Sequence, residues 1–297
     1  SAILAPDKKP IMQLDDSLKA NYLRDGYLVL PSFFSAAEIA PLCSETERLI
    51  EAARGKAESD AVHDLEAPHQ PDGEPRVRRI KDPVQQFDVY REFSRNEKLL
   101  SVVRVLIGDN VRFHNSKINI KAAGFGAAVE WHQDWAFYPH TNDAVLAVGI
   151  ALQDLTEDNG PLMVVPGSHR GPVYDHHTDG VFSGAVRASS VAEESKRAIA
   201  LTGPAGSITI HHVRTLHGSA VNHSSRPRPL LLIGYAAADA WPLLGITEFE
   251  TFNQNLVCGS ECLVPRMKSL PVRLPMPAAR FQGSIYENQR ALKERAF

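Results

Sequence analysis

The spacing of apolar residues changes character near residue 110. Up to that point apolar positions recur every three or four residues, which is typical of helices with one buried face. This spacing predicts helices over 16–24, 35–54 and 97–107, with a short apolar strand at 27–30. Ser35 and Glu38 have the spacing of a capping box at the start of the longest helix. The first part of the chain, 1–110, is therefore expected to be a helical N-terminal section.

One stretch of this section has a different composition. Segment 56–79 contains many charged residues and several prolines but few large apolar side chains. Such a segment buries too little apolar surface to offset its loss of conformational entropy. We therefore expect a mobile loop or lid there.

From residue 111 onward, short runs rich in β-branched residues alternate with turn-forming residues. Strands are predicted over 111–121, 129–132, 145–153, 162–165, 207–212, 218–222 and 230–237. Asn159 and Gly160 are expected to form a hairpin turn between two of them. This pattern predicts a mainly β fold with flanking helices. Its core, 111–240, would be a double-stranded β-helix (a cupin-like jelly roll), with the N-terminal helices packed outside.

The remaining residues, 241–297, contain five prolines spread among polar and apolar residues, and we expect an irregular C-terminal wrap. Residues 1–297 are expected to form a single domain, since 297 residues fit one large domain and no repeat is visible.

Composition narrows the class of protein. Hydrophobic residues make up 43% of the chain and charged residues 23%, as in ordinary globular proteins. A net charge of −3 gives no reason to expect a nucleic-acid or membrane-surface partner. The chain has no apolar run of the roughly 18 residues that a membrane span needs, and its first ten residues do not resemble a signal peptide. The three cysteines suit a reducing compartment, so a cytoplasmic location is expected.

Candidate chemistry is concentrated around one extended segment. His132 and Asp134 are two residues apart, so both side chains would point to the same face of a strand and reach one metal ion. A third ligand would come from segment 211–219, which offers three histidines. Two histidines and one carboxylate leave open positions on Fe(II). A His-x-Asp pair is also common on strand surfaces without any metal. Arg226 and Arg228 lie further along, and a buried arginine beside a metal would suit a carboxylate ligand.

Several motifs in order carry a resemblance to a known family. They are Arg24–Pro31, Trp131-His132-Gln133-Asp134, Glu157–His169, His217-Gly218-Ser219 and Arg228. With them the chain resembles the phytanoyl-CoA dioxygenase family of Fe(II)- and 2-oxoglutarate-dependent oxygenases, and the resemblance covers most of the chain.

The resemblance implies a role for individual residues. His132, Asp134 and His217 would bind the metal, and Arg228 would hold the distal carboxylate of 2-oxoglutarate. Arg226 is the rival for that role. Further residues of the co-substrate site would be Ser219, Lys117, Gln133 and Arg79, and the substrate pocket would include Trp135, Phe137 and Tyr138.

The resemblance also implies the reaction. An enzyme with Fe(II), 2-oxoglutarate and O₂ would oxidise, and most simply hydroxylate, an unactivated C–H bond of a small organic substrate, releasing succinate and CO₂. The carboxylate at Asp134 favours hydroxylation over halogenation, while desaturation, epoxidation and ring formation stay open. The alternatives from other classes are a cupin-like metal isomerase, a non-catalytic metal-binding sandwich and a 2-oxoglutarate sensor. The sequence does not select the substrate or the oligomeric state.

Overall fold

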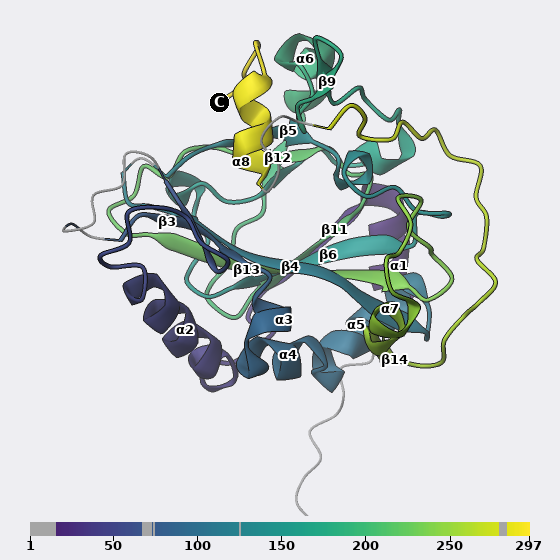
Figure 1. The fold of residues 1–297 in the computed structure, drawn as a ribbon, viewed down its shortest axis with the longest axis horizontal. Helices are drawn as coiled ribbons and strands as arrows, with labels where there is room; N and C mark the ends of the chain where they lie inside the picture. The colour runs from purple at the N-terminus through teal and green to yellow at the C-terminus, as the bar shows by residue number, and fades with distance from the viewer. Residues whose placement is uncertain (1–15, 67–72, 74, 125, 279–283) are drawn as a thin grey trace, which may run out of the picture.

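The computed structural model of the chain describes residues 16–66, 73, 75–124, 126–278 and 284–297. Its strands form two antiparallel sheets that face each other (Figure 1). The larger sheet contains, in spatial order, β1 (Tyr27–Leu30), β11 (Ile208–His212), β6 (Val145–Ala151), β13 (Arg228–Ala237), β4 (Val111–Lys121), β3 (Val77–Lys81) and β2 (His63–Leu65), with β14 (Leu256–Cys258) paired to β4. The smaller sheet contains β10 (Ile199–Ala200), β7 (Met163–Val164), β12 (His217–Ser219) and β5 (Val129–His132). A separate pair consists of β8 (His177–Thr178) and β9 (Val181–Phe182).

Helices α2 to α5 cover the outer face of the large sheet, while the small sheet lies on its other side (Figure 1). The helices are α1 (Asp16–Asp25), α2 (Ala36–Glu51), α3 (Pro83–Gln86), α4 (Asp88–Ser94), α5 (Glu97–Ile107), α6 (Ala192–Ser195), α7 (Phe249–Gln254) and α8 (Ile285–Asn288). The 3₁₀ turns are η1 (Asp134–Ala136), η2 (Glu157–Asn159), η3 (Ser168–Arg170), η4 (Ala188–Val191) and η5 (Gln289–Ala291). The predicted class, a jelly roll with helices packed outside, is confirmed. In the described part of the chain, no helix is long and apolar enough to cross a membrane.

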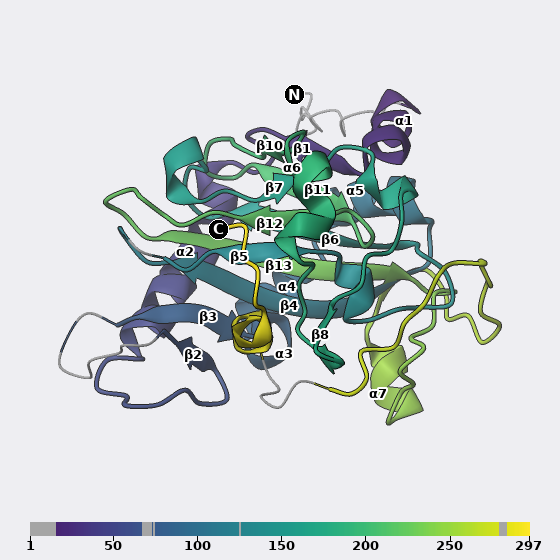
Figure 2. The same ribbon diagram turned by 90° about the horizontal axis from the view of Figure 1, so that it is seen from above.

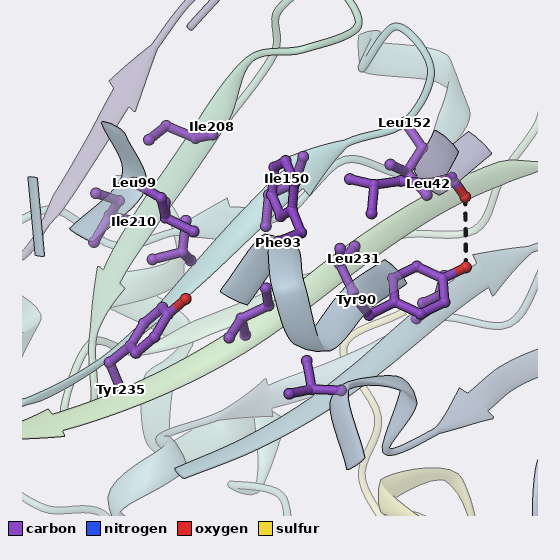
Figure 3. Packing of buried hydrophobic residues seen from close by; sticks show 14 of the residues in the cluster. Leu42, Tyr90, Phe93, Leu99, Ile150, Leu152, Ile208, Ile210, Leu231 and Tyr235 are labelled. Carbon is purple, nitrogen blue, oxygen red and sulfur yellow. Dashed lines mark hydrogen bonds between the residues drawn. The ribbon is translucent and has the colours of Figure 1, made fainter. Parts of the chain in front are cut away.

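The main hydrophobic core lies between these helices and the large sheet (Figure 3). Alternate residues of a strand point to opposite faces, so each strand contributes every second side chain to this core. Ile150 of β6 and Leu231 of β13 pack there beside Tyr90 of α4. The Tyr90 hydroxyl points at the carbonyl of Leu42 at 3.4 Å. The intervening residues of the same strands face the small sheet, and they form the floor of the site described below.

Local signals located several elements well. Helix α5 and strands β1, β4 and β5 have the predicted bounds, and α2 begins one residue after its predicted cap. The capping box is present, because the Ser35 hydroxyl accepts a hydrogen bond from the amide of Glu38 and the Glu38 carboxylate accepts one from the amide of Ser35. The buried face of α2 includes Ile39, Leu42 and Leu49, as its periodicity predicts.

The expectation of a loop over the whole of 56–79 is wrong. Strands β2 and β3 pair with each other, and β3 continues the large sheet by pairing with β4. Val77 and Ile80 are buried in the main core. The charged residues that suggested a solvated segment are paired instead, since the buried Arg78 donates to Asp64 at 3.0 Å. Residues 67–72 and 74 lie outside the described residues.

The predicted hairpin at Asn159 and Gly160 is also wrong. Strands β6 and β7, on either side, belong to different sheets, so no hairpin joins them. Thr156 caps the short turn η2, and Gly160 adopts a left-handed φ of 69°. The C-terminal segment is largely irregular, as expected, but it contains α7, β14 and α8.

Candidate metal centre

Two histidines are brought together by strand pairing in the small sheet. β5 and β12 run antiparallel in a register that places His132 directly opposite His217. Their ring centroids are 4.0 Å apart, and both side chains are buried. The order of strands in this sheet therefore selects His217 from the three histidines of segment 211–219.

Both imidazoles are oriented in the same way. His132 Nδ1 donates to the carbonyl of Glu130 at 2.8 Å, and His217 Nδ1 donates to the carbonyl of Thr215 at 2.8 Å. These bonds leave each Nε2 without a proton and directed at the space between the rings. Burial lowers the pKa of His132 to about 4 and holds the pKa of His217 well below its usual value. Both rings are therefore neutral near pH 7, as metal ligands must be.

Asp134 completes the set from the start of η1, directly after β5. Its Oδ1 lies 3.7 Å from His132 Nε2 and 3.8 Å from His217 Nε2. Its Oδ2 lies 3.4 Å from His211 Nε2, so a third histidine fixes the rotation of the carboxylate. Burial alone would raise the pKa of Asp134, but His217, His211 and Lys117 together hold it well below its usual value.

The three donor groups fit a metal ion. One ligand atom from each of His132, Asp134 and His217 lies within 4.8 Å of the others, and all three residues are buried. Two neutral imidazoles and a carboxylate on one side of an ion leave its other positions open, as in non-haem Fe(II) oxygenases. An ion bound here would supply the centre at which a 2-oxo acid and O₂ meet. The described residues do not add a fourth protein ligand to the group.

A cavity of about 40 Å³ opens beside these three residues, between the two sheets. Strand β4 forms its floor, because alternate residues of this strand point into it. The polar residues of this stripe are Asn115, Lys117, Asn119 and Lys121. The opposite wall is made by the small sheet and by α8. In Figure 2, which views the molecule from above, α8 is the yellow helix drawn in front of the large sheet near β3 and β4.

Arg228 marks the end of the cavity away from Asp134. It lies at the start of β13, opposite Lys121, and only 3% of it is exposed. Its Nη2 donates to the carbonyl of Gly160 at 2.6 Å, whereas Nε and Nη1 have no partner among the described residues. Burial lowers the pKa of Arg228 to about 10, so the guanidinium remains charged near pH 7. A buried, half-satisfied guanidinium of this kind suits a carboxylate ligand.

The segment around Gly160 thus has a different role from the expected hairpin. Its carbonyl anchors Arg228, and a β-carbon at this position would lie 2.6 Å from the carbonyl oxygen of Ala220 and 2.8 Å from Lys121 Cδ. Together with its positive φ, this crowding requires glycine. Ser219, at the end of β12, also lines the cavity.

Two more of the residues suggested by the sequence line the same cavity. Lys117 projects from β4 and Tyr138 from the turn after Asp134. Burial lowers the pKa of Lys117, and the negative charge of Asp134 partly opposes this effect. The Tyr138 hydroxyl interacts with Asp134 and Asn115, and burial with the charge of Asp134 holds its pKa well above the usual value.

Four other suggested residues lie outside the cavity lining. The Gln133 amide is used entirely by backbone groups, since it donates to Pro172 and Arg214 and accepts from the amide of Tyr174. Arg79 is 3.7 Å from Asp64, with which it forms an ion pair. Gln133 therefore supports the turn between two ligands rather than a cofactor, because the strand alternation that directs its neighbours inward directs it outward.

The aromatic residues after the ligands are divided between core and pocket. Trp135 is 1% exposed, donates from Nε1 to the carbonyl of Pro271 and packs in a separate core cluster. Phe137 packs edge-on against the His132 ring with centroids 5.8 Å apart. Of the three suggested residues, only Tyr138 lines the cavity.

Sequence reasoning missed the contribution of the C-terminal segment. Ile285 and Tyr286 of α8 line the cavity, and Arg78 lies 5.0 Å from the centre of the Tyr286 ring. A signal was present, because Ser284 and Glu287 have the spacing of a capping box, and the Ser284 hydroxyl does accept from the Glu287 amide. The contributions of Asn115, Asn119 and Lys121 follow from the alternation of β4, once the inward face of that strand is known.

Comparison with known proteins agrees with this geometry. The family model described as phytanoyl-CoA dioxygenase matches residues 22–230. A probable alpha-ketoglutarate-dependent hypophosphite dioxygenase of Stutzerimonas stutzeri is 43% identical over 93% of this chain and 97% of its own length. L-proline trans-4-hydroxylase of Streptomyces griseoviridis is 32% identical over 73% of this chain and 84% of its own.

A crystal structure of EctD from S. alaskensis with 2-oxoglutarate and 5-hydroxyectoine superposes with a TM-score of 0.62. It is 26% identical, and the match covers 90% of this chain and 88% of that one. The fold agrees with that of the EctD structure, and the chain belongs to the phytanoyl-CoA dioxygenase family of Fe(II)- and 2-oxoglutarate-dependent oxygenases.

Proposed function

We propose that the chain uses His132, Asp134 and His217 to bind Fe(II) and Arg228 to bind 2-oxoglutarate, and that it hydroxylates a small substrate. The observation that carries this proposal is the unsatisfied guanidinium of Arg228 in the same cavity as the three ligand residues. A cupin-like metal isomerase or a non-catalytic metal-binding sandwich would not bind 2-oxoglutarate. Neither would need a buried arginine with unpaired nitrogen atoms in the cavity of the metal ligands.

The protein's own groups prepare the site in three ways. The backbone carbonyls of Glu130 and Thr215 fix the imidazole tautomers, and His211 fixes the rotation of Asp134. Arg228 and Ser219 would orient the distal carboxylate of the co-substrate. Tyr286 and Ile285 form part of the cavity wall, which would limit the access of bulk water. Bound Fe(II) and 2-oxoglutarate would supply the oxidising chemistry.

The overall reaction would insert one oxygen atom of O₂ into a bond to hydrogen in the substrate. The second oxygen atom would enter 2-oxoglutarate, which loses CO₂ and becomes succinate. The hypophosphite dioxygenase and proline hydroxylase relatives support a small substrate. C–H hydroxylation is supported by the proline hydroxylase relative.

A second candidate reaction is supported by the 43% identical hypophosphite dioxygenase, which matches nearly the full length of the chain. Hypophosphite would gain one oxygen atom at a P–H bond and become phosphite. In both reactions the iron ligands and the arginine have the same roles.

The three free cysteines support the cytoplasmic location expected from the sequence.

Incubation of the purified protein with Fe(II), 2-oxoglutarate and ¹⁸O₂ tests the proposal. Hypophosphite, L-proline and ectoine would be supplied separately, and succinate and the labelled product would be measured by mass spectrometry. We expect one small substrate to stimulate succinate formation and to gain one labelled oxygen atom. His217→Ala should abolish both signals, and unlabelled product or activity without 2-oxoglutarate would contradict the proposal.

A further inference from the structure

Lys117 is an uncompensated cation at the metal end of the cavity. It lies in the centre of β4, and its neighbours in the stripe that faces the cavity are the uncharged Asn115 and Asn119. The described part of the chain gives its ammonium neither an ion pair nor a hydrogen bond, and the nearest influential charge is that of Asp134. Placing a lysine there is costly unless something negative joins it.

The other basic groups near the cavity already have partners. Lys121 donates to the carbonyls of Ala127 at 2.5 Å and Ala220 at 2.6 Å, so its ammonium is satisfied by backbone. Arg79 forms an ion pair with Asp64. Arg228 is the group suited to the distal carboxylate of 2-oxoglutarate, which leaves Lys117 as the cation without an assigned partner.

The charges of the loaded site lead to the same residue. The positive charges of Fe(II) and Arg228 would be balanced by Asp134 and the two carboxylates of 2-oxoglutarate. Lys117 then adds a positive charge that no described protein carboxylate offsets within bonding distance. A neutral substrate would leave the charge of the half-buried Lys117 unpaired, whereas a monoanion would neutralise it.

The position of Lys117 separates it from the arginine. Arg228 pairs with Lys121 across the strands, and Leu232 pairs with Lys117. Four residues of β-strand span roughly 14 Å, so the lysine and the arginine serve opposite ends of the cavity. Near the lysine end lie Asp134, Tyr138 and Asn115, and the Asn115 amide can donate a hydrogen bond to an oxyanion.

We propose that Lys117 is the specificity-determining residue for a small monoanionic substrate, whose charged group it holds beside the metal ligands. This inference rests on the proposed function and narrows its substrate class. Asn115, which lines the cavity beside Lys117, would share the oxyanion with it.

Isothermal titration calorimetry without O₂ tests this inference by binding alone. The complex of the protein with Fe(II) and 2-oxoglutarate would be titrated with hypophosphite and with formate, and with ectoine as a probe without net charge. We expect at least one of the two anions to bind the wild-type complex. Lys117→Met should weaken that binding by roughly thirtyfold or more, because it removes one partner of a buried charge pair.

Two controls define the result. Lys117→Arg keeps the charge and should stay within about tenfold of wild type. Lys196→Met removes an exposed lysine and should change nothing. In Lys117→Met the affinity for 2-oxoglutarate should change by less than about threefold, which would also show that the variant is folded and loaded.

Three results would overturn the inference. They are wild-type anion affinity in Lys117→Met, an equal loss of 2-oxoglutarate affinity in that variant (which would make Lys117 a co-substrate residue), and binding of neither anion to the loaded wild-type protein. A wild-type protein that fails to bind Fe(II) and 2-oxoglutarate at all would contradict the proposed function instead.

Discussion

At the scale of single residues, Arg228 distinguishes this site from a simple metal-binding pocket. Its guanidinium is anchored through one nitrogen atom to Gly160 and is otherwise unpartnered among the described residues. Two charge-assisted hydrogen bonds to a carboxylate would complete it.

Arg228→Ala should therefore raise the apparent KM for 2-oxoglutarate by about a hundredfold, which corresponds to about 3 kcal/mol of lost binding free energy. Arg228→Lys should fall between alanine and wild type, because it keeps the charge but loses the planar fork. Initial rates at varied 2-oxoglutarate concentration would measure both effects. Arg226, two residues away, is exposed and is the matched control. If Arg226→Ala weakened 2-oxoglutarate binding strongly and Arg228→Ala only slightly, the co-substrate contact would belong to Arg226 and the present assignment would be wrong.

Asp134 is the second residue whose replacement is informative. Its carboxylate lies within 4 Å of three imidazoles, of which two are proposed ligands. Asp134→Gly should abolish hydroxylation and reduce Fe(II) affinity by at least about tenfold, because one of three protein ligands is lost. Equilibrium binding of Fe(II) without O₂ would measure the second effect. Full hydroxylase activity in this variant would exclude the carboxylate as a ligand.

At the scale of elements, β3 is the clearest case where pairing decides the structure. Its sequence, Val-Arg-Arg-Ile-Lys, does not alternate apolar and polar residues, so no local strand signal exists. It becomes a strand because β4 on one side and β2 on the other satisfy its backbone.

Hydrogen exchange measured by mass spectrometry tests this assignment. Amides of 77–81 should exchange at least about tenfold more slowly than those of the exposed residues 57–59, because strand pairing protects them from solvent. If the amides of 56–81 all exchanged equally fast, the result would contradict the strand assignment and support the mobile loop expected from composition.

Helix α8 is the element through which the end of the chain reaches the cavity. Tyr286→Ala would remove the ring beneath Arg78 and open the wall near Arg228, and we expect a roughly tenfold weaker affinity for 2-oxoglutarate. Tyr286→Phe keeps the ring and should remain near wild type. Calorimetric titration with 2-oxoglutarate would separate the two variants, and identical affinities would show that α8 does not shape this end of the site.

The difference between local and long-range interactions explains how much of the structure could be predicted from the sequence. Helix α2 and strand β4 were predictable because caps and alternation are local. His132 and Asp134 were predictable for the same reason, since two residues of extended chain fix their relation. Tyr286 was not, because it lies 69 residues after His217, the last of the three ligands, and reaches the cavity only through tertiary packing.

At the scale of the whole molecule, the two sheets contribute different groups to the site. The small sheet holds the histidines in register, and the large sheet supplies Lys117 and Arg228 from neighbouring strands. The helices beneath the large sheet bury its opposite face (Figure 1). The chemistry therefore depends on how the sheets face each other, a relation that neither the motif spacing nor the hydrophobic pattern contains.

Visible absorption of the protein with Fe(II) and 2-oxoglutarate, in the absence of O₂, tests the central claim most directly. A 2-oxo acid that chelates Fe(II) gives a charge-transfer band, and we predict this band in the wild-type protein at one equivalent per chain. His132→Ala and His217→Ala should lose it, whereas Arg226→Ala should retain it. No band in the folded wild-type protein, or an undiminished band in either histidine variant, would contradict the assignment of this site.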